Sequence, residues 1–312
     1  MEKRNQTNEV TFILLGFSDI PEHQTSLFVV FFFMYVITLI GNLLIILTIR
    51  VNPQLHIPMY FFLGNLSLVD ICFITSTIPK LLIHLLSQNK TISFSDCLGQ
   101  VFFMFSTGST EFFLLAVMAY DRYVAICNPL RYTIVMKKRV CVVLVVISWI
   151  TASLTSLLHT LMASRLSFHG SNTIQHFFCD LPPLLRLSCS DTSVNEILIF
   201  TDGPFVVMAP FLFTVVSYVH IISTILKIPS AMGRRKAFST CSSHLIVVSL
   251  FYGTDIFVYF RPDSNFSFNY DRVVSVMYTV VTPMLNPFIY SLRNNEVKGA
   301  LKKVIASKLF TQ

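Results

Sequence analysis

The stretch "SLFVVFFFMYVITLIGNLLIILTIR", residues 26–50, contains no charged side chain before its last residue, Arg50. A bilayer core about 30 Å thick is crossed by roughly 20 apolar residues in helical form. Strands with open edges cannot face lipid, because their backbone groups would have no hydrogen-bond partners there. Residues 26–50 therefore predict a membrane-spanning helix.

The rest of the chain repeats this pattern. Of its 312 residues, 54% are hydrophobic and only 12% are charged, which is typical of a membrane protein. Six further segments are long and apolar enough to cross a bilayer. Together the seven predicted spans are 26–50, 58–84, 98–127, 140–161, 196–226, 238–260 and 272–292. We expect an all-α membrane protein: one domain over 1–312, a seven-transmembrane helix bundle followed by a short amphipathic C-terminal helix.

Basic residues indicate the orientation. Most of the 23 Lys and Arg fall in alternate connections, such as Lys137-Lys138-Arg139 and Arg234-Arg235-Lys236, which predicts that these connections are cytoplasmic. Residues 1–25 then form an outer tail, and residues 293–312 a cytoplasmic tail, of a multi-pass plasma-membrane protein. The inner loops also explain the net charge of +7, so we do not infer nucleic-acid binding.

The outer segments carry sequons and cysteines. Asn5-Gln6-Thr7 is an N-x-T sequon in the outer tail, which makes Asn5 the favoured glycosylation site; Asn89 and Asn265 are weaker candidates. Cys97 opens the third span, and Cys179 lies in the long outer loop, where disulfides form. We expect Cys97 and Cys179 to pair.

A second stretch, "MAYDRYVAIC" (118–127), places Asp121 and Arg122 at the cytoplasmic end of the third span. Adjacent charges can form a local ion pair, and a rearrangement that frees the arginine would expose a cation to a cytoplasmic partner. An ordinary interfacial charge cap explains the pair equally well when it is taken alone.

Several longer sequence motifs favour a functional role for Asp121 and Arg122 over a charge cap. With "MAYDRYVAIC", the strings "PMYFFLGNLSLVD" (58–70), "SY" (217–218), "KAFSTCSSH" (236–244) and "PMLNPFIYSLRN" (283–294) resemble the olfactory receptors, a branch of the rhodopsin-like G-protein-coupled receptors. "GN" at 41–42 and Trp149 fit as well. The Tyr of "MAYDRY", the long outer loop and "NPLRY" resemble the tetrapod-type class.

The resemblance implies a G-protein switch at the cytoplasmic side. In this family the Arg leaves its Asp partner and faces the G protein. Pro287 lacks a backbone N–H and kinks the seventh helix, as a hinge or as a fixed bend, and His244 is equally well explained as an interfacial histidine. The matching switch residues are Asp121, Arg122, Tyr123, Tyr218, Lys236, His244, Pro287 and Tyr290.

Two acids lie deep within the spans. Asp70 and Glu111 match family positions that border a sodium-type pocket, with Asn42 and Asn286 nearby. Two carboxylates in low dielectric either share a proton or recruit a cation. Apart from this sodium ion we expect no cofactor and no metal.

The resemblance also places a ligand site in the outer half of the bundle. Such a cavity is mostly apolar with a few polar groups. Asp255, with Asp202 as a second acid, would suit a ligand with an amine or another strong donor group. The favoured alternative is that Asp255 is satisfied internally by a neighbouring hydroxyl, by water or by a basic residue such as His159 or Arg261. The expected lining residues are Met104, Phe105, Gly108, Ser109, Phe112, Asp202, Val206, Val207, Tyr252, Asp255, Ile256, Tyr259 and Thr279.

One residue departs from the family pattern. His169 stands where we expect a Cys that would pair with Cys189, so Cys189 becomes an odd thiol or, with His169, a ligand for a soft metal ion. His176 and Cys179 of "HFFCD" also have metal-like spacing, but Cys179 is better used in the disulfide.

The resemblance predicts an odorant receptor that binds a small volatile and activates an olfactory-type stimulatory G protein to raise cyclic AMP. The alternative is an ion-coupled transporter, which the lack of an internal two-fold repeat disfavours. Hydrolase and nucleotide-binding motifs are missing from the sequence, so we expect no enzyme.

Overall fold

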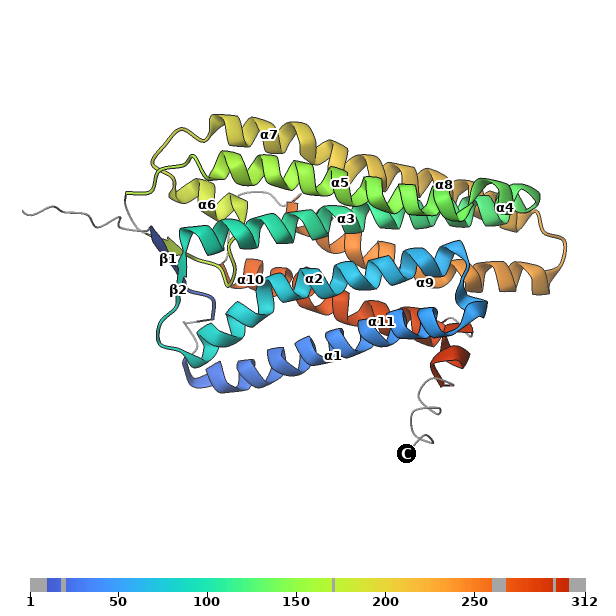
Figure 1. The fold of residues 1–312 in the computed structure, drawn as a ribbon, viewed down its shortest axis with the longest axis horizontal. Helices are drawn as coiled ribbons and strands as arrows, with labels where there is room; N and C mark the ends of the chain where they lie inside the picture. The colour runs from blue at the N-terminus through green and yellow to red at the C-terminus, as the bar shows by residue number, and fades with distance from the viewer. Residues whose placement is uncertain (1–9, 18–20, 170–171, 260–267, 294–295, 303–312) are drawn as a thin grey trace, which may run out of the picture.

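The computed structural model describes residues 10–17, 21–169, 172–259, 268–293 and 296–302. Long helices run side by side along the longest axis of the molecule (Figure 1). Three short strands lie at one end, which we call the disulfide end, and helix α4 lies at the other, which we call the α4 end.

The seven predicted spans are present, with small shifts at their ends. Within the described residues, six helical segments are long and apolar enough to cross a membrane, and Cys241–Thr254 is a shorter apolar stretch within the remaining span. The spans are α1 (Gln24–Val51), α2 (Pro58–Leu86), α3 (Phe94–Cys127), α5 (Lys138–Ala163), α7 (Ser193–Gly203) continued by η4 (Pro204–Met208) and α8 (Ala209–Leu226), α9 (Ala231–Tyr259), and α10 (Phe268–Val276) continued by η6 (Met277–Val281) and α11 (Thr282–Arg293). The fold is therefore the predicted seven-helix membrane bundle.

Shorter helices complete the chain. They are α4 (Tyr132–Val135), α6 (Leu181–Leu187), the turns η1 (Pro21–His23), η2 (Pro53–Leu55) and η3 (Pro129–Arg131), and a helical segment over 296–302. In 296–302 Val297 is buried while Glu296 and Lys298 are exposed, so this segment is the predicted amphipathic C-terminal helix.

Local chemistry sets several helix ends and bends. Pro58 stands in the first turn of α2, where its missing N–H costs nothing. The Ser93 hydroxyl caps α3 by accepting a hydrogen bond from the Asp96 N–H at 3.1 Å. Pro287 lies inside α11, where it removes a helical hydrogen bond.

A small sheet departs from the purely helical expectation. Strand β1 (Thr11–Leu14) pairs antiparallel with β2 (Thr91–Ser93) and parallel with β3 (Thr173–Ile174). Phe12 and Leu14 of β1 point into the protein and are almost fully buried. This pairing joins three distant segments, so the hydropathy of the spans could not predict it.

The helices differ in how much they are covered by protein. In their most apolar windows 67% of α3 is buried, against 22% of α1 and 28% of α5. Helix α3 is therefore the central helix, and α1 and α5 present apolar side chains outward, as lipid-facing helices do. At Gly41 the backbone of α1 approaches α11 so closely that a Cβ atom would lie 3.2 Å from Pro287.

Candidate functional site

Residues 176–179 of the outer loop are tethered at the disulfide end. The predicted disulfide joins Cys97 of α3 to Cys179. The Cys179 N–H donates to Gln100 Oε1 at 2.7 Å, and Gln100 Nε2 donates to the Ser76 carbonyl of α2 at 2.9 Å. The loop is thereby fixed to both α2 and α3.

His176 and Asp180 flank this tether in unusual electrostatic surroundings. Nε2 of His176 lies 3.0 Å from the Ser275 hydroxyl of α10, while its Nδ1 accepts from the Phe178 N–H at 3.4 Å. The neutral imidazole therefore carries its proton on Nε2. Burial, and then the charge of Arg272, lower the pKa of His176 to about 3. Burial raises the pKa of Asp180 to about 6, although the Leu181 N–H that it caps opposes the rise.

The remaining outer-loop predictions have mixed outcomes. Cys189 is a free, exposed thiol. No group of three or more His, Cys, Asp or Glu side chains that could hold a metal ion occurs among the described residues. Asn5 and Asn265 lie outside the described residues. Asn89 is exposed, and its Oδ1 accepts from the Thr91 hydroxyl at 2.7 Å.

The expected ligand-lining residues fall into two packed groups. Phe112, Val206 and Tyr252 share one hydrophobic cluster, with Val207 against it, and the Phe112 and Tyr252 ring centroids are 5.3 Å apart. Met104 belongs to a second cluster nearer the disulfide end, and Phe105 packs against it.

Small polar side chains of the same set lie between the helices. Gly108 lets the Phe73 ring approach, since a Cβ there would lie 3.6 Å from that ring. Ser109 is buried, and Thr279 is fully buried and donates its hydroxyl to the Ser275 carbonyl of its own helix. The side chains of Asp255, Ile256 and Tyr259 lie outside the described residues.

Asp202, the expected second acid of the ligand site, has a partner within the protein. Its Oδ2 lies 2.6 Å from Nε2 of His159, which joins α7 to α5. His159 is 4% exposed and Asp202 22% exposed. The imidazole that we considered as a partner for Asp255 is therefore engaged by Asp202.

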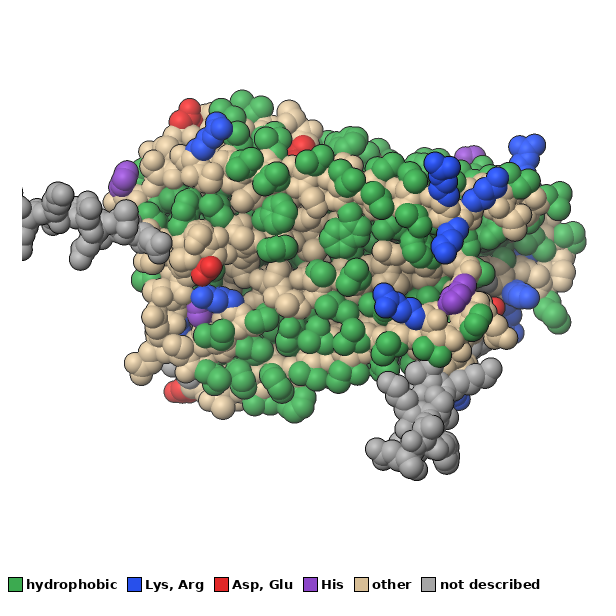
Figure 2. Space-filling model, in the orientation of Figure 1, with side chains coloured by type: hydrophobic (Ala, Val, Ile, Leu, Met, Phe, Trp, Pro, Cys, Tyr) green, Lys and Arg blue, Asp and Glu red, His purple; other side chains and the backbone are tan. Residues whose placement is uncertain are grey.

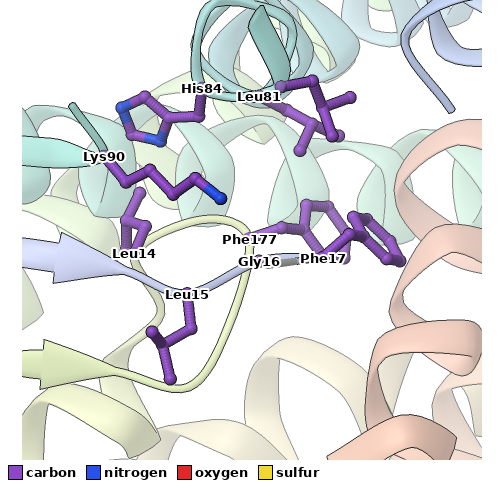
Figure 3. A pocket seen from close by; sticks show the side chains of 9 residues that line it. Leu14, Leu15, Gly16, Phe17, Leu81, His84, Lys90 and Phe177 are labelled. Atoms are coloured by element: carbon purple, nitrogen blue, oxygen red, sulfur yellow. The ribbon is translucent and has the colours of Figure 1, made fainter. Parts of the chain in front are cut away.

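A small pocket opens elsewhere, between β1, the end of α2 and Phe177 (Figure 3). Its volume of about 10 Å³ is close to that of one water molecule, too small for an odorant. None of its lining residues belongs to the predicted ligand set; they are Leu14, Leu15, Gly16, Phe17, Leu81, His84, Leu85, Lys90 and Phe177.

The predicted ion-pocket residues are all buried. Asn286 Nδ2 lies 3.1 and 3.0 Å from the two carboxylate oxygens of Asp70, to which it donates. Asn42 Nδ2 donates to the Thr38 and Pro283 carbonyls, which links α1 to α11. The amide oxygens of Asn42 and Asn286 accept no hydrogen bond. Glu111 is 1% exposed, and both it and Asp70 act electrostatically on Tyr290. These oxygens fit a hard cation such as sodium.

At the α4 end, the expected Asp121–Arg122 ion pair is not formed. Asp121 instead accepts a hydrogen bond from the Tyr132 hydroxyl of α4 at 2.9 Å. Successive residues of a helix point about 100° apart, so the neighbours in sequence need not meet. Arg122 is buried, and its charge acts on Tyr218, His244 and Tyr290.

A second bond at the α4 end joins two helices. The Tyr218 hydroxyl of α8 lies 2.6 Å from Nδ1 of His244 in α9, and both side chains are buried. His244 is thus an interhelical partner rather than an interfacial cap. Tyr123 packs near Tyr120 and His220, while Lys236 is exposed.

Sequence reasoning missed three positions. Tyr132 and Tyr60 lie within the quoted "NPLRY" and "PMYFFL" strings but received no role. Tyr60 donates to Glu296 at 2.6 Å and so anchors segment 296–302 to α2. Gln100 gave no sequence signal, because its role depends on a loop 79 residues away.

The bundle of apolar helices, with buried polar side chains that join neighbouring helices, defines a multi-pass membrane protein. Comparisons with known proteins agree. The family model described as "Olfactory receptor" matches residues 31–308. Olfactory receptor 1G1 of Gorilla gorilla gorilla is 57% identical over 305 residues, covering 98% of this chain and 97% of that protein. Olfactory receptor 1F1 of Homo sapiens is 54% identical over 311 residues, covering 100% of both. The chain belongs to the olfactory receptor family.

Proposed function

We propose that this receptor binds a small volatile odorant in the half of the bundle toward the disulfide end and activates an olfactory-type stimulatory G protein, raising cyclic AMP. In this proposal the N-terminus is extracellular and the C-terminus cytoplasmic, because most Lys and Arg of the connections gather at the α4 end. In the view of Figure 2, more Lys and Arg side chains lie at the α4 end than at the disulfide end.

The main support for this proposal is the arrangement of side chains at the α4 end. Arg122 is buried while two hydrogen bonds, Tyr132–Asp121 and Tyr218–His244, join neighbouring elements around it. Outward movement of α9 would separate His244 from Tyr218 and open a path from Arg122 to the cytoplasm. The ligand's part is to favour that second arrangement by binding it more tightly.

An odorant screen tests this proposal. Cells that carry the olfactory-type stimulatory G protein should raise cyclic AMP with an agonist, and Arg122→Ala should abolish the response at equal surface expression while leaving agonist binding largely intact. Substrate uptake without a cyclic AMP response would favour the ion-coupled transporter instead. Full signalling by Arg122→Ala would refute the switch.

We further propose that Asp70, Asn286 and Asn42, with Glu111 nearby, hold a sodium ion. The carboxylate of Asp70 and the two free amide oxygens are the ligands that support this. Asp70→Asn should remove any sodium dependence of basal signalling. Unchanged dependence in Asp70→Asn and Glu111→Gln would leave a shared proton as the better account.

The lining set supports a largely apolar odorant. Asp202 has a partner in His159, so an amine agonist would depend on Asp255. Asp255→Asn should then weaken a cationic agonist by about 1.5–3 kcal/mol and leave a neutral agonist unchanged. Equal potency of both agonist types in Asp255→Asn would make the acid structural.

A further inference from the structure

The α4 end carries a compact group of basic side chains on the lipid-facing side of the bundle. Between Asp121 and Asp180 the sequence contains no acidic residue, yet this interval holds Arg131, Lys137, Lys138 and Arg139. We call these four residues the basic ridge. All four are exposed, and none has an ion-pair partner among the described residues. Figure 2 shows basic side chains gathered at this end of the molecule.

Three of the four charges stand at the start of one helix. Lys137 is the N-cap of α5, Lys138 and Arg139 are its first residues, and no acid occurs in the first turn. The N-terminal end of a helix carries partial positive charge and favours anions. Three adjacent cations here repel one another and the helix end, so an external anion would relieve an unfavourable charge arrangement.

The surface directly beyond the ridge faces lipid. Val142, Val143, Val146 and Ile147 of α5 are exposed by 40–55%, as side chains in contact with acyl chains are. The ridge therefore lies where an apolar helix surface ends, at the level of the phosphate groups of a bilayer. The tendency of basic loops to stay on the cytoplasmic side explains why the ridge lies at this end of the bundle. It does not explain why four cations without ion-pair partners among the described residues are grouped beside one lipid-facing helix.

The ridge shares no residue with the proposed G-protein switch. Helix α5 packs mainly on α3, the helix that carries Asp121 and Arg122, whereas the Tyr218–His244 bond joins α8 and α9. One covalent link connects the two regions: Arg131 precedes Tyr132, whose hydroxyl donates to Asp121.

We propose that the basic ridge binds the head group of an anionic phospholipid of the inner leaflet. This rests on the orientation given under the proposed function. The lipid phosphate and carboxylate oxygens pair with Lys137, Lys138 and Arg139, and its acyl chains lie along the exposed valines and Ile147 of α5. Binding there holds α4 in place beside Asp121.

The single tryptophan of the chain provides a direct test that needs neither agonist nor G protein. Trp149 lies on α5 and is half-buried, about 15 Å along the helix from Arg139 at about 1.5 Å per residue. Its fluorescence is measured in phosphatidylcholine vesicles that contain either brominated phosphatidylserine or brominated phosphatidylcholine at the same mole fraction. Brominated phosphatidylserine should quench Trp149 more strongly.

Charge variants assign the preference to the ridge. The triple variant Lys137→Gln, Lys138→Gln, Arg139→Gln should lose it, with relative affinity for the anionic lipid falling about fivefold for each charge removed. The matched control Arg50→Gln, Lys227→Gln, Lys298→Gln removes the same charge from exposed positions elsewhere at the α4 end and should retain the preference. The charge-conserving variant Lys137→Arg, Lys138→Arg, Arg139→Lys should also retain it.

Three results would overturn the proposal. Equal quenching by both lipids in the unmodified protein would exclude a preference. Equal loss in the matched control would indicate a diffuse field rather than a site. An unchanged lipid preference in the triple variant, with weaker nucleotide exchange by the G protein in pure phosphatidylcholine, would make the ridge a G-protein surface. These lipid measurements need no agonist, so a failed odorant screen would leave their interpretation unchanged.

Discussion

Removing the carboxylate of Asp202 should destabilise the receptor without weakening its response to odorant. In Asp202→Ala, Nε2 of His159 loses its 2.6 Å partner while the imidazole stays 4% exposed. An unsatisfied buried polar group costs about 1–3 kcal/mol. Since Asp202 is 22% exposed, water partly replaces the lost carboxylate, and we expect the lower half of that range. At about 2–4 °C per kcal/mol, a loss of about 1–2 kcal/mol should lower the melting temperature by roughly 2–8 °C.

Thermal unfolding of purified receptor in nanodiscs measures this shift, and a double-mutant cycle with His159→Ala isolates the pair. The comparison variant is Glu196→Ala, which removes an exposed acid from the first turn of the same helix together with its 2.8 Å hydrogen bond from the Thr192 hydroxyl, and should cost about 0.5–1 kcal/mol. If the effects of Asp202→Ala and His159→Ala add to within about 0.5 kcal/mol, the two side chains do not interact. Loss of agonist potency at an unchanged melting temperature would place Asp202 in the ligand site and refute the structural role.

Three further predictions follow from single contacts. Burial raises the pKa of Asp180 from 3.8 to about 6, so between these pH values the folded protein binds a proton that the unfolded chain does not. The contribution of Asp180 to the free energy of unfolding therefore falls as the pH rises from about 4 to 6. In Asp180→Asn the free energy of unfolding should depend less on pH across that range and be higher by up to about 3 kcal/mol at pH 7. Tyr132→Phe removes the 2.9 Å bond to Asp121 and should raise basal cyclic AMP at equal surface expression; unchanged basal signalling would make the bond structural only. Gly41→Ala places a Cβ atom 3.2 Å from the Pro287 ring, whereas Gly99→Ala has open space around it, so the Gly41 variant should melt at a lower temperature than the Gly99 variant. Equal melting temperatures would show that the ring moves aside without cost.

The seven spans, their order and the family could be predicted from the sequence. A helix in lipid satisfies its backbone hydrogen bonds within its own segment. The helical structure of an apolar run such as 26–50 can therefore be predicted without knowing the rest of the chain. The family strings are equally local, since "PMYFFL" and "KAFSTCSSH" are read from consecutive residues. The Cys97–Cys179 disulfide was also predicted, from the outer positions of these cysteines together with the resemblance to the family, which leaves Cys189 as the odd thiol.

Pairings between side chains were decided by the tertiary structure. Sequence adjacency suggested that Asp121 pairs with Arg122, but the rotation of α3 and the position of α4 bring Tyr132 to the carboxylate instead. His159 meets Asp202 across two helices, a partner for this acid that the sequence did not indicate. Strand β1 joins segments that span hydropathy cannot relate. The physical reason is common to these cases: apolar length determines that a helix crosses the membrane, whereas its rotation and tilt, which decide the partner of each polar side chain, are determined by packing against the other helices.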